Sequence, residues 1–238
     1  MSGASQPLNL SRSPPYLAAL LLVALAAFWP SYLSLGFAGS PTYVHFHAGA
    51  CVLWMLMLIA QPIFITRRRM DLHRFVGKSS YVIAPMLIVS MVVLANYRIN
   101  LIAPNDYAIQ TYILYLQLSL AAVFALFYGL AIAYRHTTAM HARFMVCTAL
   151  TLIDPILARI LPVIAPEMIA FAQWISFTIT DLVVIALIWM ERRSATGRKI
   201  FPLALVILLL AQLPALMGID RTDSWQQFTR WFASLPIS

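Results

Sequence analysis

The sequence has few charged residues of either sign. Asp, Glu, Lys and Arg make up 10% of its 238 residues, against about one quarter in soluble domains. Hydrophobic residues make up 62% of the chain, and the mean hydropathy is +0.83. This composition excludes an ordinary soluble domain and predicts an integral membrane protein.

The short motifs of several enzyme classes are also missing. The chain contains no HExxH, GxSxG, P-loop, CxxC or GxGxxG pattern, so zinc-protease, hydrolase and nucleotide-binding functions have no motif behind them. Cysteine is scarce too. Cys51 and Cys147 fall at different depths of the predicted spans, whereas a disulfide needs Cα atoms within about 7 Å of each other. We therefore expect two free thiols.

Long apolar runs are abundant. A transmembrane helix needs about 20 mostly apolar residues, and seven runs approach or exceed this length, at residues 16–37, 44–65, 81–97, 111–134, 144–164, 168–190 and 200–217. They predict an all-α integral membrane bundle of seven transmembrane helices over residues 16–217. Residues 1–15 are predicted to be a disordered tail.

The net charge of +8 raises the question of nucleic-acid binding, which the positions of the charges exclude. Most Lys and Arg residues fall in the N-terminal tail and in alternate loops, after the second, fourth and sixth runs. The positive-inside rule assigns these loops to the cytoplasm. The predicted partner is therefore the lipid bilayer, with the N-terminus cytoplasmic and the C-terminus outside.

Polar residues of the second run share one helical stripe. A helix over residues 44–65 places His47, Cys51, Trp54, Leu58 and Gln61 on one face, while the other faces are almost wholly aliphatic. Because an unpaired polar group facing hydrocarbon is costly, the stripe is predicted to face other helices. His47 is a candidate ligand there; the alternative is a histidine that only makes hydrogen bonds.

Two basic segments carry a histidine at matching positions. His73 lies in the predicted loop 66–80 and His141 in the next basic loop, and each leads into a span. A helix N-terminus disfavours the imidazolium, which leaves a neutral nitrogen suited to iron. Two such histidines on neighbouring helices are typical of a b-type haem site. The alternative is a helix cap or a phosphate contact.

Three ionisable residues, Asp154, Arg159 and Asp181, lie inside apolar runs. Such residues are costly in a bilayer and usually face the bundle interior. Helix rise places the two carboxylates at nearly one depth and Arg159 within reach of Asp181. We predict an ion pair between Arg159 and Asp181; the alternative is a proton or ligand site.

The last segment, 218–238, is amphipathic. Trp225, Phe228, Phe232 and Leu235 share one helical face, and Asp223 is the expected N-cap. The pattern predicts a short interfacial helix on the outer surface, with docking of a partner as the alternative.

Several of these motifs together resemble a known family. The histidine near the start of the second run, His73-Arg74-x-x-Gly77, His141-x-x-Phe144-Met145 and the later Arg159 are similar to an uncharacterised family of bacterial multi-spanning membrane proteins, a domain of unknown function. The resemblance covers residues 44–159, with Cys147 standing where the family has an arginine. It implies cytochrome-b-like helices and a bacterial inner membrane.

The leading functional hypothesis is a membrane redox protein that binds haem b or a quinone. Electrons would move between a site near His73 and His141 and an outer site near His47, and haem iron is the one metal expected. The first alternative is a proton-coupled transporter that uses Asp154, Arg159 and Asp181. The second is a non-catalytic subunit that assembles with partner membrane subunits. The sequence leaves open whether the protein is an enzyme.

Overall fold

The computed structural model describes residues 10–36, 39–101, 107–194 and 198–237, and all regular structure within these ranges is helical. Most of the predicted disordered tail lies outside the described residues. Nine α-helices are seen in the described ranges: α1 (Pro14–Phe28), α2 (Thr42–Thr66), α3 (Met70–Asn100), α4 (Tyr107–Ala133), α5 (Thr138–Leu150), α6 (Ile153–Ile164), α7 (Ala172–Glu191), α8 (Ile200–Leu216) and α9 (Asp223–Ala233).

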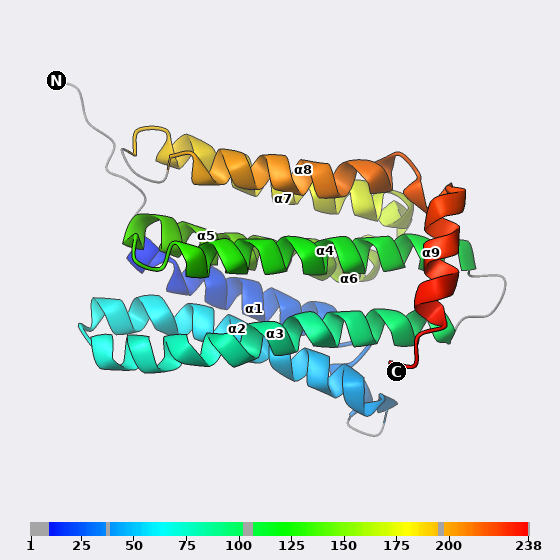
Figure 1. The fold of residues 1–238 in the computed structure, drawn as a ribbon, viewed down its shortest axis with the longest axis horizontal. Coiled ribbons are helices and arrows are strands. Elements are labelled where there is room, and N and C mark those ends of the chain that lie inside the picture. The colour runs from blue at the N-terminus through cyan, green and yellow to red at the C-terminus, as the bar shows by residue number, and fades with distance from the viewer. Residues whose placement is uncertain (1–9, 37–38, 102–106, 195–197, 238) are drawn as a thin grey trace.

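Helices α1 to α8 run side by side, and α9 lies across one end of the bundle (Figure 1). Each helix from α1 to α8 packs against the next one in the chain, most weakly at the step from α5 to α6. In addition, α1 packs against α6, and α8 packs against α4. The end opposite α9 is called the basic end here. It carries the α2–α3, α4–α5 and α7–α8 connections, with Arg67, Arg69, Arg135 and Arg192.

Five helical segments are long and apolar enough to cross a membrane: Thr42–Thr66, Met70–Asn100, Tyr107–Ala133, Thr138–Ile164 and Pro166–Glu191. The prediction of an all-helical chain with several such segments is confirmed. The count of seven is not, because α1 and α8 have 15 and 17 residues and extend about 22 and 25 Å, short of a hydrocarbon core of about 30 Å.

Prolines explain where two of the predicted runs are interrupted. The first run was expected to stay helical to residue 37, but α1 ends at Phe28, because Pro30 lacks the backbone N–H that would continue the helical hydrogen bonds. The fifth run divides into α5 and α6 around Thr151. Pro155 lies four residues later, and a proline ring clashes with the carbonyl at that spacing.

The sides of the bundle are apolar. Val82, Val89, Leu182 and Leu210 are each more than half exposed and come from α3, α7 and α8. Soluble monomers rarely expose apolar surface on this scale, and such surface marks contact with lipid or another protein. The structure therefore agrees with the composition in indicating a membrane protein.

The predicted loop 66–80 is mostly helix, so that prediction was wrong. Helix α3 already begins at Met70, and the turn is reduced to residues 67–69, with Arg68 at φ 56°. The left-handed conformation at Arg68 lets the chain reverse within three residues. Val76, which lies in the predicted loop, packs against the apolar core around Trp54, and this burial extends the helix beyond the apolar run.

Helix α9 covers the end of the bundle with its apolar face. Phe232 is buried, and Trp225, Phe228 and Leu235 pack beside it, as the shared face predicted. The expected cap was wrong: Thr222, and not Asp223, accepts the hydrogen bond from the backbone nitrogen of Trp225.

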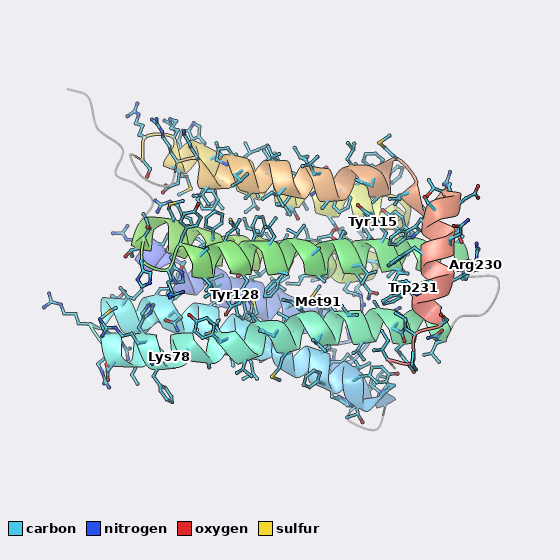
Figure 2. The ribbon with its side chains drawn as sticks, viewed as in Figure 1. Lys78, Met91, Tyr115, Tyr128, Arg230 and Trp231 are labelled. Atoms are coloured by element: carbon cyan, nitrogen blue, oxygen red, sulfur yellow. The ribbon has the colours of Figure 1, made fainter. Side chains whose placement is uncertain are left out.

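Two further hydrogen bonds hold α9 to the bundle. Asn96 donates to the Phe232 carbonyl at 2.6 Å, and Trp225 donates to the Thr111 carbonyl at 3.0 Å. The apolar face of α9 is therefore directed at the ends of α3 and α4. Arg230 and Trp231 are exposed, and Figure 2 shows Arg230 on the side of α9 that faces away from the bundle.

A buried ion pair joins α5 to α7 near the basic end. Arg143 donates from Nε at 2.8 Å and from Nη2 at 2.6 Å to Oε2 of Glu191, and the two side chains are 7% and 0% exposed. Arg143 also donates to the Ala139 carbonyl at 2.7 Å. The sequence pattern does not indicate this pair, because Glu191 lies next to arginines at the end of its apolar run.

We expect Glu191→Gln to destabilise the protein by roughly 3 to 5 kcal/mol, because it leaves the Arg143 charge buried without a carboxylate. The double variant Arg143→Met with Glu191→Leu should recover most of this loss, since neither charge is then buried. Thermal melts of purified protein in detergent measure both effects.

The exposed pair of Arg69 and Asp71 provides the matched control. Asp71→Asn should leave the melting temperature nearly unchanged, because exposed ion pairs contribute little. A double variant that melts no higher than Glu191→Gln alone would contradict the structural role of the buried pair.

Candidate functional site

Five polar or aromatic side chains lie between α2, α3 and α4 in the basic half of the bundle. Trp54 and Gln61 are two turns apart on one face of α2, His73 and Ser80 come from α3, and Tyr128 comes from α4. We call these residues the basic-end polar cluster. The internal stripe predicted on α2 is therefore seen in the structure, with Trp54 fully buried.

Hydrogen bonds and ring contacts connect part of this cluster. Ser80 donates to the Gly77 carbonyl at 2.6 Å, so the Tyr128 hydroxyl, 3.1 Å from Ser80 Oγ, acts as donor to it. The Trp54 ring meets the Tyr128 ring edge-on, with centroids 5.5 Å apart. Tyr128 lies where α4 and α3 face each other (Figure 2), so the cluster spans three helices.

Several atoms of the cluster are buried without a hydrogen-bond partner in the described part of the chain. They are Trp54 Nε1, both Gln61 side-chain polar atoms and His73 Nδ1. Most buried polar atoms in proteins are hydrogen-bonded, and a group of exceptions calls for a partner that the chain does not supply. These four atoms make the cluster the strongest candidate for a binding site.

His73 belongs to this cluster, and His141 occupies the matching position of α5. Each is the fourth residue of its helix, α3 and α5 respectively, so their predicted equivalence holds in the structure. His141 is close enough to act electrostatically on His73, and the His73 ring faces the backbone of Gln61.

The hydrogen bond of His141 determines its tautomer. Its Nδ1 lies 2.8 Å from the Ala131 carbonyl, and a carbonyl only accepts, so Nδ1 carries the proton and the neutral ring keeps its lone pair on Nε2. Metal-bound histidines commonly donate their second nitrogen to a carbonyl in this way. The structure thus leaves a lone pair on Nε2 of His141, while Nδ1 of His73 is buried without a hydrogen-bond partner among the described residues.

The described side chains do not form a donor set for a metal ion bound by side chains alone. No group of three or more His, Cys, Asp or Glu side chains within the described ranges is arranged to hold one. A haem differs, because its porphyrin supplies four nitrogen ligands and leaves two positions for the protein.

His47 lies near the other end of α2, about 21 Å along the helix from Gln61. Ser90 donates its hydroxyl proton to the Leu87 carbonyl at 2.6 Å, so it accepts from His47 Nδ1 at 2.9 Å. The His47 Nε2 lone pair then faces the Cys51 thiol at 3.5 Å. The structure thus separates His47 from His73 and His141, as a two-site arrangement requires.

Asp154 and Asp181 border a second polar region. Gln173 donates to Asp154 at 2.7 Å, and Gln212 donates to Asp181 at 3.1 Å. A small cavity of about 30 Å³ is lined by Asp154 and by Gln212, the partner of Asp181. Ser119, Thr151 and Thr180 also line it, and the rest of its lining is apolar. A cavity of this size with several polar side chains in its wall has room for water.

The predicted ion pair between Arg159 and Asp181 is not formed, and that prediction was wrong. Asp181 faces Gln212 on α8, whereas the Arg159 guanidinium lies 5.0 Å from the centre of the Phe28 ring on α1. The reason is helical rotation. Arg159 follows Asp154 by five residues, which turns it about 140° around α6, so the two residues face opposite neighbours.

Two residues that bond to the predicted site residues, Gln212 and Ser90, were not predicted from the sequence. Gln212 was visible as the lone polar residue of its run, and its partner on α7 could be found only from the packing. Ser90 gave no signal, because a serine inside an apolar helix usually bonds to its own backbone.

No family model matches this sequence, and no curated protein or solved structure matches it either. The resemblance to a family of unknown function therefore stays a prediction, and functional inference depends on the geometry alone.

Proposed function

We propose that this chain is a membrane redox protein that binds haem b or a quinone at the basic-end polar cluster. The observation that carries the proposal is the group of four buried polar atoms, on Trp54, Gln61 and His73, that no described residue engages. The imidazole of His141 is near enough to act electrostatically on His73. Both ligands have atoms that this group can bind.

The haem form rests on the two imidazoles. His141 Nε2 and His73 Nδ1 would hold the iron from α5 and α3, and the Ala131 carbonyl would orient His141 through its Nδ1 proton. A bound haem would supply reversible one-electron transfer at a potential set by its axial ligands and its surroundings. The cluster would keep water away from the iron, because Trp54 and Phe124 fill the space toward the bundle centre.

The quinone form rests on the hydrogen-bond donors. A quinone head group presents two carbonyl oxygens, and Trp54 Nε1 and Gln61 Nε2 are donors that no described residue engages. The Trp54 ring meets the rings of Phe124 and Tyr128 edge-on, and the three rings offer apolar surface to a flat ring.

The proposal includes a membrane topology. All seven predicted apolar runs would lie in a bacterial inner membrane, with α1 and α8 accommodated by their flanking residues or by local thinning of the bilayer. The basic end would face the cytoplasm and the α9 end the outside. The N-terminus is then cytoplasmic and the C-terminus outside, so the cofactor would lie near the cytoplasmic surface.

We expect protein purified after haem-replete expression to show a Soret band that shifts on reduction. His141→Ala and His73→Ala should each lose most of it, because each removes one proposed ligand. His136→Ala is the matched control, since His136 is exposed at the same end of the bundle, and it should keep the spectrum.

If the wild type shows no Soret band, the haem form is wrong and the quinone form is tested by solvent extraction and chromatography. Quinone should then co-purify with the wild type and be lost from Trp54→Phe with Gln61→Leu, since this pair removes both donors while keeping the aromatic ring. Trp189→Phe, at an exposed tryptophan, is the control. Protein that carries neither cofactor contradicts the proposal.

A second candidate function, a proton-coupled carrier, is favoured by the cavity beside Asp154. Asp154 lines this cavity, and among the described residues Asp154 and Asp181 each accept a hydrogen bond from a glutamine amide and form no ion pair. Carboxylates in such surroundings are suited to taking up and releasing a proton. Ionisable residues inside membrane segments often mark such proton pathways.

For this candidate, we expect proteoliposomes loaded with a pH-sensitive dye to show proton flux under an imposed membrane potential. Asp154→Asn and Asp181→Asn should each abolish most of the flux, because the amide does not titrate. Asp223→Asn, on the exposed side of α9, should not. Equal flux in all four proteins would rule out a proton role for these carboxylates.

A further inference from the structure

One side of α3 is not covered by the helices that pack against it. Helix α3 packs against α2, α4 and α9, yet Phe75, Val82 and Val89 are 77%, 60% and 56% exposed. These three residues are seven apart in the sequence, so they lie along one side of the helix. We call this row of exposed apolar residues the α3 stripe.

Two basic side chains lie at the basic end of the α3 stripe. Arg74 and Lys78 are one helical turn apart, and both are exposed. Lys78 precedes Val82 by one further turn, and Figure 2 places Lys78 on α3 toward the basic end of the bundle. The stripe therefore carries two positive charges at one end and aliphatic side chains along the rest of its length.

The two charges have no counter-charge in the described part of the chain. Neither side chain forms an ion pair or a hydrogen bond with a described residue. Asp71, the acidic residue closest to them in the sequence, is paired with Arg69 at 3.2 Å. Like charges four residues apart on a helix repel each other. An anion beside Arg74 and Lys78 would therefore stabilise this end of α3.

The length of α3 places these charges at the level of lipid head groups. Helix α3 has 31 residues and rises about 46 Å, about 16 Å more than a hydrocarbon core. Its apolar run begins at Tyr81, so Lys78 and Arg74 lie about 5 and 10 Å outside it. The head-group layer is about 5 to 8 Å thick on each side, and long basic side chains reach polar groups at this boundary.

We propose that Arg74 and Lys78 bind the phosphate of an anionic phospholipid whose acyl chains lie along Val82 and Val89. A soluble anion would match only the charges, and an apolar protein segment would match only the aliphatic side chains. An anionic phospholipid matches both parts of the α3 stripe. The site requires only that α3 crosses the bilayer, so it does not depend on the proposed cofactor or on which side the basic end faces.

The test is a titration of the full-length protein in detergent with phosphatidylglycerol, with bound lipid counted by native mass spectrometry and phosphatidylcholine as the reference. Wild type should bind phosphatidylglycerol more tightly than phosphatidylcholine. Arg74→Gln with Lys78→Gln should raise the apparent Kd for phosphatidylglycerol about thirtyfold, because each basic residue near an anionic surface contributes about 1 kcal/mol. Lys78→Gln alone should raise it about fivefold on the same basis, and it serves if the double variant cannot be purified.

Arg192→Gln with Arg198→Gln is the matched control. Both arginines are exposed at the same end of the bundle, and the change in net charge equals that of the site variant. The Arg192 guanidinium already lies 4.0 Å from the centre of the Trp189 ring. The control should bind phosphatidylglycerol as the wild type does, which separates a defined site from a general effect of positive charge.

Glycerol phosphate tests the contribution of the acyl chains, because it carries the same anionic group without them. It should not displace bound phosphatidylglycerol at concentrations where the free lipid does. The proposal is overturned if the wild type does not prefer phosphatidylglycerol, if the control loses as much affinity as the site variant, or if glycerol phosphate competes as well as the lipid. A complex of two chains without bound lipid would also overturn it, since a second copy would then cover the α3 stripe.

Discussion

The rest of this structure depends on the inability of hydrocarbon to form hydrogen bonds. A polar side chain on the outside of an apolar bundle loses water without gaining a partner. The sides of the bundle are accordingly aliphatic, with Val82, Val89, Leu182 and Leu210 exposed. Polar groups are collected between helices, and the positions where they gather are therefore the positions where chemistry is possible.

Three such positions are separated along the bundle. The basic-end polar cluster carries unpartnered donors and acceptors around Gln61 and His73. The cavity beside Asp154 is mainly apolar, and Gln173 donates a hydrogen bond to the Asp154 carboxylate. The Arg159 guanidinium lies over the Phe28 ring and forms no ion pair with a described residue. The first position differs from the other two in its buried polar atoms that no described residue engages, and this is why the proposed cofactor is assigned to it.

Small features of the backbone decide which polar groups meet. The interruption near Thr151, four residues before Pro155, divides one apolar run into α5 and α6. On one side of it, Arg143 forms an ion pair with Glu191 and so joins α5 to α7 near the basic end. On the other side, Asp154 turns toward the cavity while Arg159 turns toward α1.

The sequence by itself determined the helical class, the apolar exterior, the internal stripe of α2 and the matching places of His73 and His141. These follow from composition and from the 3.6-residue period, which are local properties of the chain. It did not determine that Asp181 pairs with Gln212, that Arg143 pairs with Glu191, or that Arg159 lies over Phe28. Those contacts depend on which helices are neighbours and how each is rotated about its axis. Both are decided by packing across the whole bundle, so only the tertiary structure could supply them.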